Sequence, residues 1–321
     1  MSESRTTGVH RLEFDVDWPP GHVACYLLDG PEPILVDAGM PDDPDDDRDR
    51  EGTLREGLAA VGLGPADVAH LVVTHPHVDH IGQVPTVLEA ADPTVHAPGG
   101  VRERFAGDVD ALAERVERNA AVAGIEGAAR EEAVAMAVRS LERDRELLPP
   151  GAVDDWIEPG EAVDVGGHTL KPTHTPGHQA DHLVYRTDLG GESVLLAGDA
   201  AMEPFRAVAI HDGLDDGVFE AAGAYYTALD RLSALDIDRV HPGHGAVHRR
   251  FGEIIERDRG SLDRRLDSVE RALSEGLRTI PEIASRIAGE RPVRYILPEV
   301  YAAAAHLAST GRATTSVEDG V

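Results

Sequence analysis

Four residues of the types that bind metal ions lie within six positions of one another, directly after the apolar run at 71–73. They are His75, His77, Asp79 and His80. Side chains at i and i+2 of an extended segment point the same way, so the first two can meet one cation, while the last two lie past the strand and can reach a second position. Imidazole with carboxylate suits zinc and, less selectively, manganese or iron. One histidine alone would favour a surface or core role, but this group favours a metal centre.

Three later segments repeat one arrangement, in which a predicted buried strand ends at a glycine turn that presents a ligand-type side chain. His178 closes the segment His-Thr-Pro-Gly-His, Asp199 follows Gly198, and His244 lies in Pro-Gly-His-Gly. If these turns meet the first group at one sheet edge, their side chains would complete a metal site. Asp37 also ends an apolar run close to a glycine, and we expect it to orient a ligand rather than bind the metal.

The elements that must position these side chains are short strands bounded by Pro/Gly turns and separated by helical segments. The pattern predicts two sets of strands, at 9–15, 23–28, 33–36, 68–74 and 94–97, and then at 161–165, 168–172, 181–186, 193–197 and from 238. Helices are expected at 53–61, 82–91 and 218–234.

Two further regions are predicted to be helical because their apolar residues recur three and four positions apart. Residues 99–148 read as an insertion that could cover the active site, although a peripheral position is an equal alternative. From about residue 246 the chain is helical, with segments at 248–271, 280–288 and 297–308. These last helices have the size and order of a small helix-turn-helix module.

The composition is strongly acidic. The 321 residues carry a formal charge of −29, with a pI near 4.8 and a hydrophobic fraction of 41%. Lys171 is the only lysine among the 30 basic residues. An acidic surface that uses arginine in place of lysine indicates adaptation to high salt, which screens the self-repulsion. A disordered acidic protein is excluded because apolar periodic segments recur along the whole chain.

The single cysteine, Cys25, excludes an internal disulfide and agrees with a reducing cytoplasm. It lies in the apolar run at 22–28, so we expect a small core residue rather than a nucleophile. The first residues lack the apolar core of a signal peptide, and no segment approaches the roughly 20 apolar residues of a membrane span. The expectation is a soluble cytoplasmic protein without a membrane partner.

Five ordered motifs resemble those of the metallo-β-lactamase-fold hydrolases in both order and ligand type. They are Asp37, Thr74-His-Pro-His-Val-Asp-His80, Thr175-Pro-Gly-His178, Gly198-Asp199 and Pro242-Gly-His-Gly245. The resemblance spans roughly residues 9 to 250. It implies an α/β fold, the four-layer αββα sandwich, with two sheets face to face and helices outside. Residues 1–250 would form this domain, with the helical insertion at about 99–148, and residues 251–321 the C-terminal module.

The resemblance also implies a role for each ligand-type residue. Asp199 would bridge two divalent metal ions, of which zinc is favoured and manganese or iron are alternatives. Asp79 would bind and also act as the catalytic carboxylate that orients or relays a proton, and His182 would support the ligands or the fold. The remaining ligands are assigned to one ion as His75, His77 and His178 and to the other as Asp79, His80 and His244.

Aspartate at position 199 makes the chain similar to the glyoxalase II, lactonase and nuclease branches, rather than to the β-lactamases that place cysteine at the bridging position. The leading hypothesis is a dinuclear hydrolase that uses a metal-bridging hydroxide on an acyl thioester, or on a related ester or lactone. The alternative is a metal-dependent phosphodiesterase, an endoribonuclease of the lactamase-β-like type. A non-catalytic regulatory protein is least favoured, because the ligand set is complete.

The C-terminal helices resemble, more weakly, the winged-helix module that follows the hydrolase domain in some members of this family. Their sequence is acidic and provides no basic recognition helix, so nucleic acid is not the favoured partner. We expect a small-molecule acyl substrate. The module could also shape the substrate cleft or form a homodimer.

Overall fold

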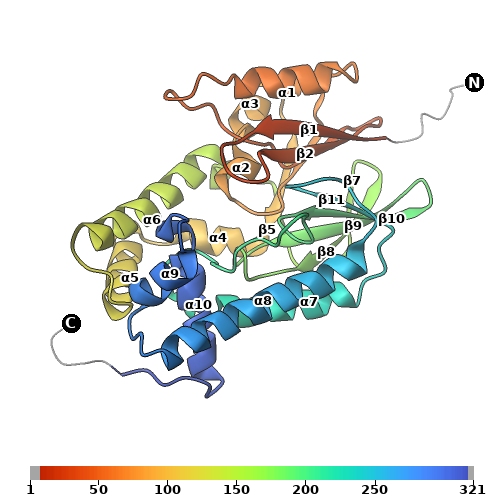
Figure 1. Ribbon diagram of the computed structural model, residues 1–321. Helices are drawn as coiled ribbons and strands as arrows, with labels where there is room; N and C mark the ends of the chain where they lie inside the picture. The colour runs from red at the N-terminus through yellow and green to blue at the C-terminus, as the bar shows by residue number, and fades with distance from the viewer. Residues whose placement is uncertain (1–7, 317–321) are drawn as a thin grey trace, which may run out of the picture.

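Two β-sheets lie face to face in the computed structural model, which describes residues 8–316 (Figure 1). The first sheet is antiparallel across β1, β2 and β3 and parallel from β3 to β6. Its six strands follow chain order as β1 (Val9–Asp15), β2 (His22–Leu28), β3 (Ile34–Val36), β4 (His70–Val72), β5 (Thr94–Pro98) and β6 (Asp155–Ile157).

The second sheet contains five strands in the order β11-β10-β9-β8-β7. Its strands pair antiparallel except for the parallel pair β10 and β11. They are β7 (Val163–Val165), β8 (His168–His174), β9 (Leu183–Leu189), β10 (Glu192–Gly198) and β11 (Arg239–Pro242). A mixed sheet with both faces covered needs apolar side chains on both sides, and β10 has them, since its last five residues are all buried.

Helices cover the outer face of each sheet, so the order of layers is helix, sheet, sheet, helix (Figure 1). The first sheet is covered by α1 (Arg50–Ala59) and α3 (Val84–Ala90), and the second by α7 (Ala221–Ser233) and α8 (Phe251–Ser274). A buried cluster that includes Tyr26 and Tyr185 fills the space between the sheets. This is the αββα arrangement that the motifs predicted.

Hydrogen bonds join the two sheets where their strands end. Tyr185 Oη donates to the Val73 carbonyl at 2.8 Å, and Tyr26 Oη donates to the Pro242 carbonyl at 2.7 Å. The amide of Ala24 donates to the Gly243 carbonyl at 2.7 Å. Because each bond has a strand-end residue as acceptor, the strand ends of one sheet are held in register with those of the other.

Residues 99–148 form three helices, as the periodicity predicted: α4 (Gly99–Ala106), α5 (Val109–Val122) and α6 (Gly127–Leu147). Their buried side chains belong to the same core cluster as the first sheet, and α6 contacts α2 (Val78–Ile81). Arg115 pairs with Asp215 at 2.6 Å, which joins α5 to the loop after β10. The insertion therefore packs on the main body rather than lying apart from it.

The C-terminal region is built from α8, α9 (Ile280–Ala288) and α10 (Leu297–Ser309), which share a separate apolar cluster. Within the described residues after 250 the structure has helices and no strand. The helical part of the expected module is thus present, while the winged-helix likeness stays a prediction. The region is not independent of the main body, because Tyr301 and Ala302 of α10 are buried in the core of the first domain.

The sequence pattern missed strand β6 and helix α2. Strand β6 was not predicted, and the segment at 68–74 is strand only at His70–Val72, so His75 and His77 follow β4 in a loop. Asp79 and His80 lie in the one-turn helix α2, for which four residues of sequence show no period. Among the described helices, none has the length and apolar character needed to cross a membrane.

We predict that Tyr185→Phe lowers the free energy of unfolding by about 1 to 3 kcal/mol, because the Val73 carbonyl then loses a donor in a site that water does not reach. Denaturant titration measures the change. The control is Tyr226→Phe, whose hydroxyl bonds an exposed carboxylate, Asp263, that water can hydrate instead. Equal losses in the two variants would contradict the prediction.

Candidate metal centre

Four strands of the two sheets end at one edge of the sandwich, and each is followed by ligand-type side chains. The segment after β4 provides His75 and His77, and α2 adds two more. The loop after β8 carries His178, the end of β10 leads into Asp199, and the end of β11 leads to His244. Residues separated by up to 169 positions therefore meet at one place, as the recurring strand-to-glycine pattern predicted.

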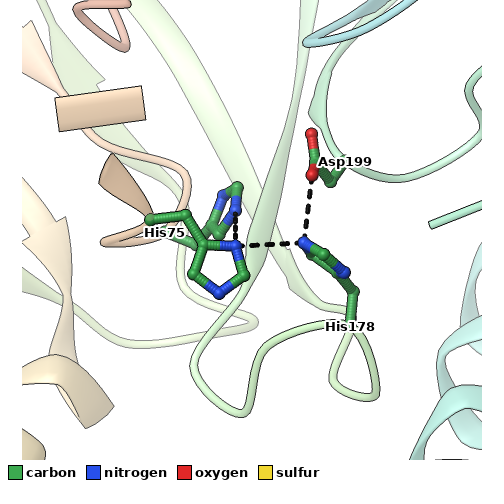
Figure 2. Close-up of side chains that lie close together, drawn as sticks. His75, His178 and Asp199 are labelled. Carbon is green, nitrogen blue, oxygen red and sulfur yellow. Dashed lines mark hydrogen bonds and ion pairs between the residues drawn. The ribbon is translucent and has the colours of Figure 1, made fainter. Parts of the chain in front are cut away.

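The first group is formed by His75, His77, His178 and Asp199, whose ligand atoms all lie within 4.8 Å of one another. His77 Nδ1 lies 3.0 Å from His75 Nε2 and 3.1 Å from His178 Nε2. His178 Nε2 also lies 3.0 Å from Asp199 Oδ2. Figure 2 shows His75, His178 and Asp199 gathered at this place, with Asp199 facing His178.

The second group is formed by Asp79, His80 and His244. Asp79 Oδ2 lies 3.2 Å from His244 Nε2. The other oxygen of Asp199, Oδ1, lies 3.1 Å from His80 Nε2 and 3.4 Å from His244 Nε2. Asp199 thus directs one carboxylate oxygen toward each group, which is the geometry of a bridging ligand.

The histidines are held with one ring nitrogen free of hydrogen, because the other nitrogen faces an oxygen that can only accept. Nδ1 of His80 donates to Asp37 Oδ2 at 2.8 Å, Nδ1 of His178 donates to the Val208 carbonyl at 3.0 Å, and Nδ1 of His244 donates to the His22 carbonyl at 2.8 Å. In a neutral imidazole the hydrogen is then on Nδ1, so Nε2 presents a lone pair to the site.

Asp37 fixes a further histidine through Thr74. The hydroxyl of Thr74 donates to Asp37 Oδ2 at 2.8 Å, so its oxygen accepts from His75 Nδ1 at 3.1 Å and leaves His75 Nε2 bare. The backbone amide of Thr74 donates to the other oxygen of Asp37 at 2.8 Å. Asp37 thus contacts His80 directly and His75 through Thr74 and belongs to neither ligand group.

His182 supports the bridging aspartate instead of joining the ligands. Its Nε2 accepts from the backbone amide of Asp199 at 3.1 Å, and its Nδ1 lies 2.6 Å from Thr175 Oγ1. Both ring nitrogens are thus used, so none is left for a cation. Of the two roles that the sequence left open for His182, the geometry favours positioning Asp199.

The ionisation of the site follows from burial and from its own charges. Burial lowers the pKa of His75 and of His77 well below the usual value, and the neighbouring imidazoles add to the effect. Burial also acts against the charged form of His80, but the carboxylates of Asp199, Asp37 and Asp79 raise its pKa well above the usual value.

The two carboxylates are held ionised. Burial raises the pKa of Asp79 and of Asp199, but the imidazoles of His80 and His244 outweigh it, so the pKa of Asp79 falls to about 2 and that of Asp199 lies well below its usual value. Burial lowers the pKa of His244, but Asp199 and Asp79 outweigh it and raise that pKa above the usual value. Metal ligands must be neutral imidazoles and ionised carboxylates, so a bound cation would have to displace the protons of His80 and His244.

Two buried polar atoms of the site make no hydrogen bond, namely His80 Nε2 and Asp199 Oδ1. An unsatisfied buried polar atom costs free energy. Once His80 has lost its second proton, both atoms offer lone pairs to the site, and they lie 3.1 Å apart. The nitrogen and oxygen donors also match those of zinc centres. The residues present therefore fit a pair of divalent cations, and the chemistry of the donors is compatible with zinc, manganese or iron.

Two glycines allow the strand ends to approach this closely. A Cβ on Gly243 would lie 2.6 Å from His80 Cε1 and 3.0 Å from Asp199 Oδ1. A Cβ on Gly198, whose φ is +47°, would lie 2.6 Å from Thr74 Oγ1 and 2.7 Å from His182 Nε2. These contacts explain why glycine precedes both Asp199 and His244 in the sequence.

The sequence did not reveal the oxygen atoms that form hydrogen bonds with the Nδ1 atoms of the histidines. The carbonyls of His22 and Val208 carry no side-chain signal, because any residue could supply them. The hydroxyls of Thr74 and Thr175 lie beside ligand motifs and could have been proposed as acceptors for a neighbouring imidazole.

The fold and the two ligand groups place this protein in a structural class. Its members are α/β proteins with an αββα sandwich and a candidate metal centre at the edge of that sandwich. The model of the metallo-beta-lactamase superfamily matches residues 18–244. Because the match covers most of the chain, this protein belongs to the metallo-beta-lactamase superfamily. Membership supports metal-dependent hydrolysis as its general chemistry.

Similar proteins have related descriptions. A beta-lactamase-like protein 2 homolog of Caenorhabditis elegans is 26% identical over 261 residues, which are 81% of this chain and 67% of that protein. The probable metallo-hydrolase YqjP of Bacillus subtilis is 25% identical over 288 residues, which are 88% of this chain and 85% of that one. Among solved structures, the metallo-beta-lactamase family protein TTHA1429 of Thermus thermophilus superposes with a TM-score of 0.77 at 26% identity, covering 95% and 94% of the two chains.

We predict that Asp37→Asn lowers the affinity of the centre for divalent metal by about 10- to 100-fold, because the carboxylate that orients His75 and His80 is lost while every ligand stays. Titration of the metal-free protein with Zn²⁺ measures it. Asp155→Asn is the matched control, since Asp155 bonds His96 across β5 and β6, and neither strand carries a residue of the ligand groups. An unchanged affinity in Asp37→Asn would show that the carboxylate does not orient the ligands.

Proposed function

We propose that the chain is a dinuclear metal-dependent hydrolase of small acyl substrates, with a thioester of the glyoxalase II type favoured and a related ester or lactone next. The observation that carries the proposal is Asp199, whose two oxygens face two separate ligand groups. Two cations held by these groups and shared by Asp199 would lie close enough together to act on one substrate. When bound, such a pair lowers the pKa of a water toward neutrality and polarises the scissile carbonyl.

The chain offers no cysteine that could compete as a nucleophile at the site. Cys25, the single cysteine, is fully buried in β2, and burial raises the pKa of its thiol far above the usual range. A thiol that stays protonated and inaccessible cannot attack a substrate. A bridging aspartate in place of a thiolate also separates this site from β-lactamases with cysteine at that position.

Asp79 is the residue for which we propose proton handling in addition to metal binding. Its Oδ2 faces His244, and His80 lies beside it on α2. An ionised carboxylate at this position can hold a water by accepting its hydrogen and so set the direction of attack. A thiolate leaves as a stable anion, so a thioester requires no separate acid for the leaving group.

The surroundings favour an uncharged acyl group over a polyanion. Val208, whose carbonyl holds His178, is 36% exposed, and Phe205 in the same loop is 39% exposed. Exposed apolar side chains on the segment that is bonded to a candidate ligand suit an acyl chain. The charge of −29 would repel a nucleic acid backbone, which ranks phosphodiester cleavage second.

An assay panel tests the substrate class. The protein is loaded with Zn²⁺ or Mn²⁺ and given acyl thioesters, lactones and single-stranded RNA, each at low and at high salt. We expect turnover of thioesters or lactones. Asp199→Asn should lower kcat/KM by about 10³-fold or more, because it removes several kcal/mol of electrostatic stabilisation and the rate falls tenfold for each 1.4 kcal/mol or so. Cleavage of RNA alone would replace the acyl hydrolase with a phosphodiesterase.

Metal content provides an independent measurement. We expect two equivalents of metal in the active protein and about one in His244→Ala, which removes a ligand of the second group only. Asp155→Asn again serves as a control with unchanged content. Activity with a single equivalent in the unaltered protein would contradict the dinuclear proposal.

A further inference from the structure

A buried carboxylate of the C-terminal helices, Glu299, binds the loop that holds His178. Glu299 lies in the first turn of α10 and is 2% exposed. Its Oε1 accepts from Arg206 Nη1 at 2.5 Å and from the backbone amide of Ala209 at 3.1 Å. Its Oε2 accepts from Arg265 Nε, in α8, at 2.7 Å. One side chain thus joins α8, α10 and the segment 206–209.

The segment 206–209 is in turn bonded to the turn that carries a metal ligand. His178 Nδ1 donates to the carbonyl of Val208, which lies directly before the amide held by Glu299. The amide of His211 donates to the Gly177 carbonyl at 3.1 Å. The two segments therefore lie alongside each other, and the position of the Val208 carbonyl decides where His178 Nε2 points.

Opposite charges stabilise the connection between Glu299 and the segment 206–209. Burial acts to raise the pKa of Glu299, but Arg206 and Arg265 hold it below the usual value, so the carboxylate is ionised. Arg206 is itself 8% exposed and lies over the ring of Tyr225, with its Cζ 5.4 Å from the centroid. Hydrogen bonds between charged groups are the stronger ones, and buried groups move little.

We propose that Glu299 is a positioning residue of the metal centre, which sets the orientation of His178 through the carbonyl of Val208. The C-terminal helices would then belong to the hydrolase machinery of their own chain. The inference rests on the proposed metal centre, and it goes further by assigning a function to a region that shares no residue with the ligand groups. Glu299 does not touch substrate, because Arg206, Ala209 and Arg265 surround its carboxylate.

The test measures binding of Co²⁺ to the metal-free full-length protein by its visible absorption, without reference to activity. In the unaltered protein we expect two binding phases, and His244→Ala identifies the phase of the second group. Glu299→Gln keeps the shape of the side chain and removes its charge. We expect it to weaken the phase of His75, His77 and His178 by about 10-fold and to leave the other phase unchanged, as for a group behind a metal-bound histidine.

Arg206→Met provides a second variant in case Glu299→Gln fails to fold. It removes the charged one of the two bonds from the segment 206–209 to Glu299, while the bond from the Ala209 amide stays. Glu299 keeps Arg265 as its partner, so no buried charge is left alone. The same selective weakening is expected. Tyr301→Phe is the matched control, because it removes the bond from α10 to the Asn119 carbonyl in the insertion and does not touch the segment 206–209.

The outcomes separate this inference from the proposed function. If the unaltered protein binds no Co²⁺, the proposed metal centre is wrong. If it binds two ions and the folded variant keeps both phases, Glu299 does not position His178. Equal weakening of both phases, or the same loss in Tyr301→Phe, would show a general structural effect and would also overturn the inference.

Discussion

The site depends on the hydrogen bonds that its histidines donate from Nδ1, because these bonds fix the orientation and the tautomer of each ring. Three imidazoles donate from Nδ1 to oxygens that can only accept, a carboxylate for His80 and carbonyls for His178 and His244. Each ring is thereby fixed both in angle and in tautomer, and its Nε2 lone pair faces the site. Without these acceptors the same side chains could rotate, and a neutral ring could place its hydrogen toward the cation.

The architecture is what brings acceptors and ligands together. Cross-sheet bonds such as Tyr26 to the Pro242 carbonyl hold the strand ends of the two sheets at one edge. Glycine at positions 198 and 243 lets the chain pass within contact distance of the ligands. Because the interior is close-packed, a small displacement of one strand end would move a ligand by a comparable amount. The rigidity of the sandwich is therefore part of the chemistry of the centre.

The regions outside the sandwich also contact this edge. The insertion packs into the core of the first sheet and joins the loop after β10 through Arg115 and Asp215. The C-terminal helices reach the same loop through Glu299. A loop that carries the acceptor for His178 is thus held from two sides by buried or partly buried ion pairs, which are screened less by salt than exposed ones. This arrangement suits a protein whose surface is strongly acidic.

The sequence by itself predicted the fold class and the seven ligand-type residues that the structure brings together, because strands that end at turns and carry His or Asp leave a readable local pattern. It also indicated Asp37, a carboxylate near a glycine at a strand end. Only the tertiary structure decided which oxygens of Asp199 face which group, that His182 supports Asp199, and that β6 and α2 exist. The carbonyls of His22 and Val208 and the side chain of Glu299 likewise act through contacts between distant segments. A backbone carbonyl has no residue type of its own, and a contact across 90 positions leaves no local period, so neither could be read before the chain was folded.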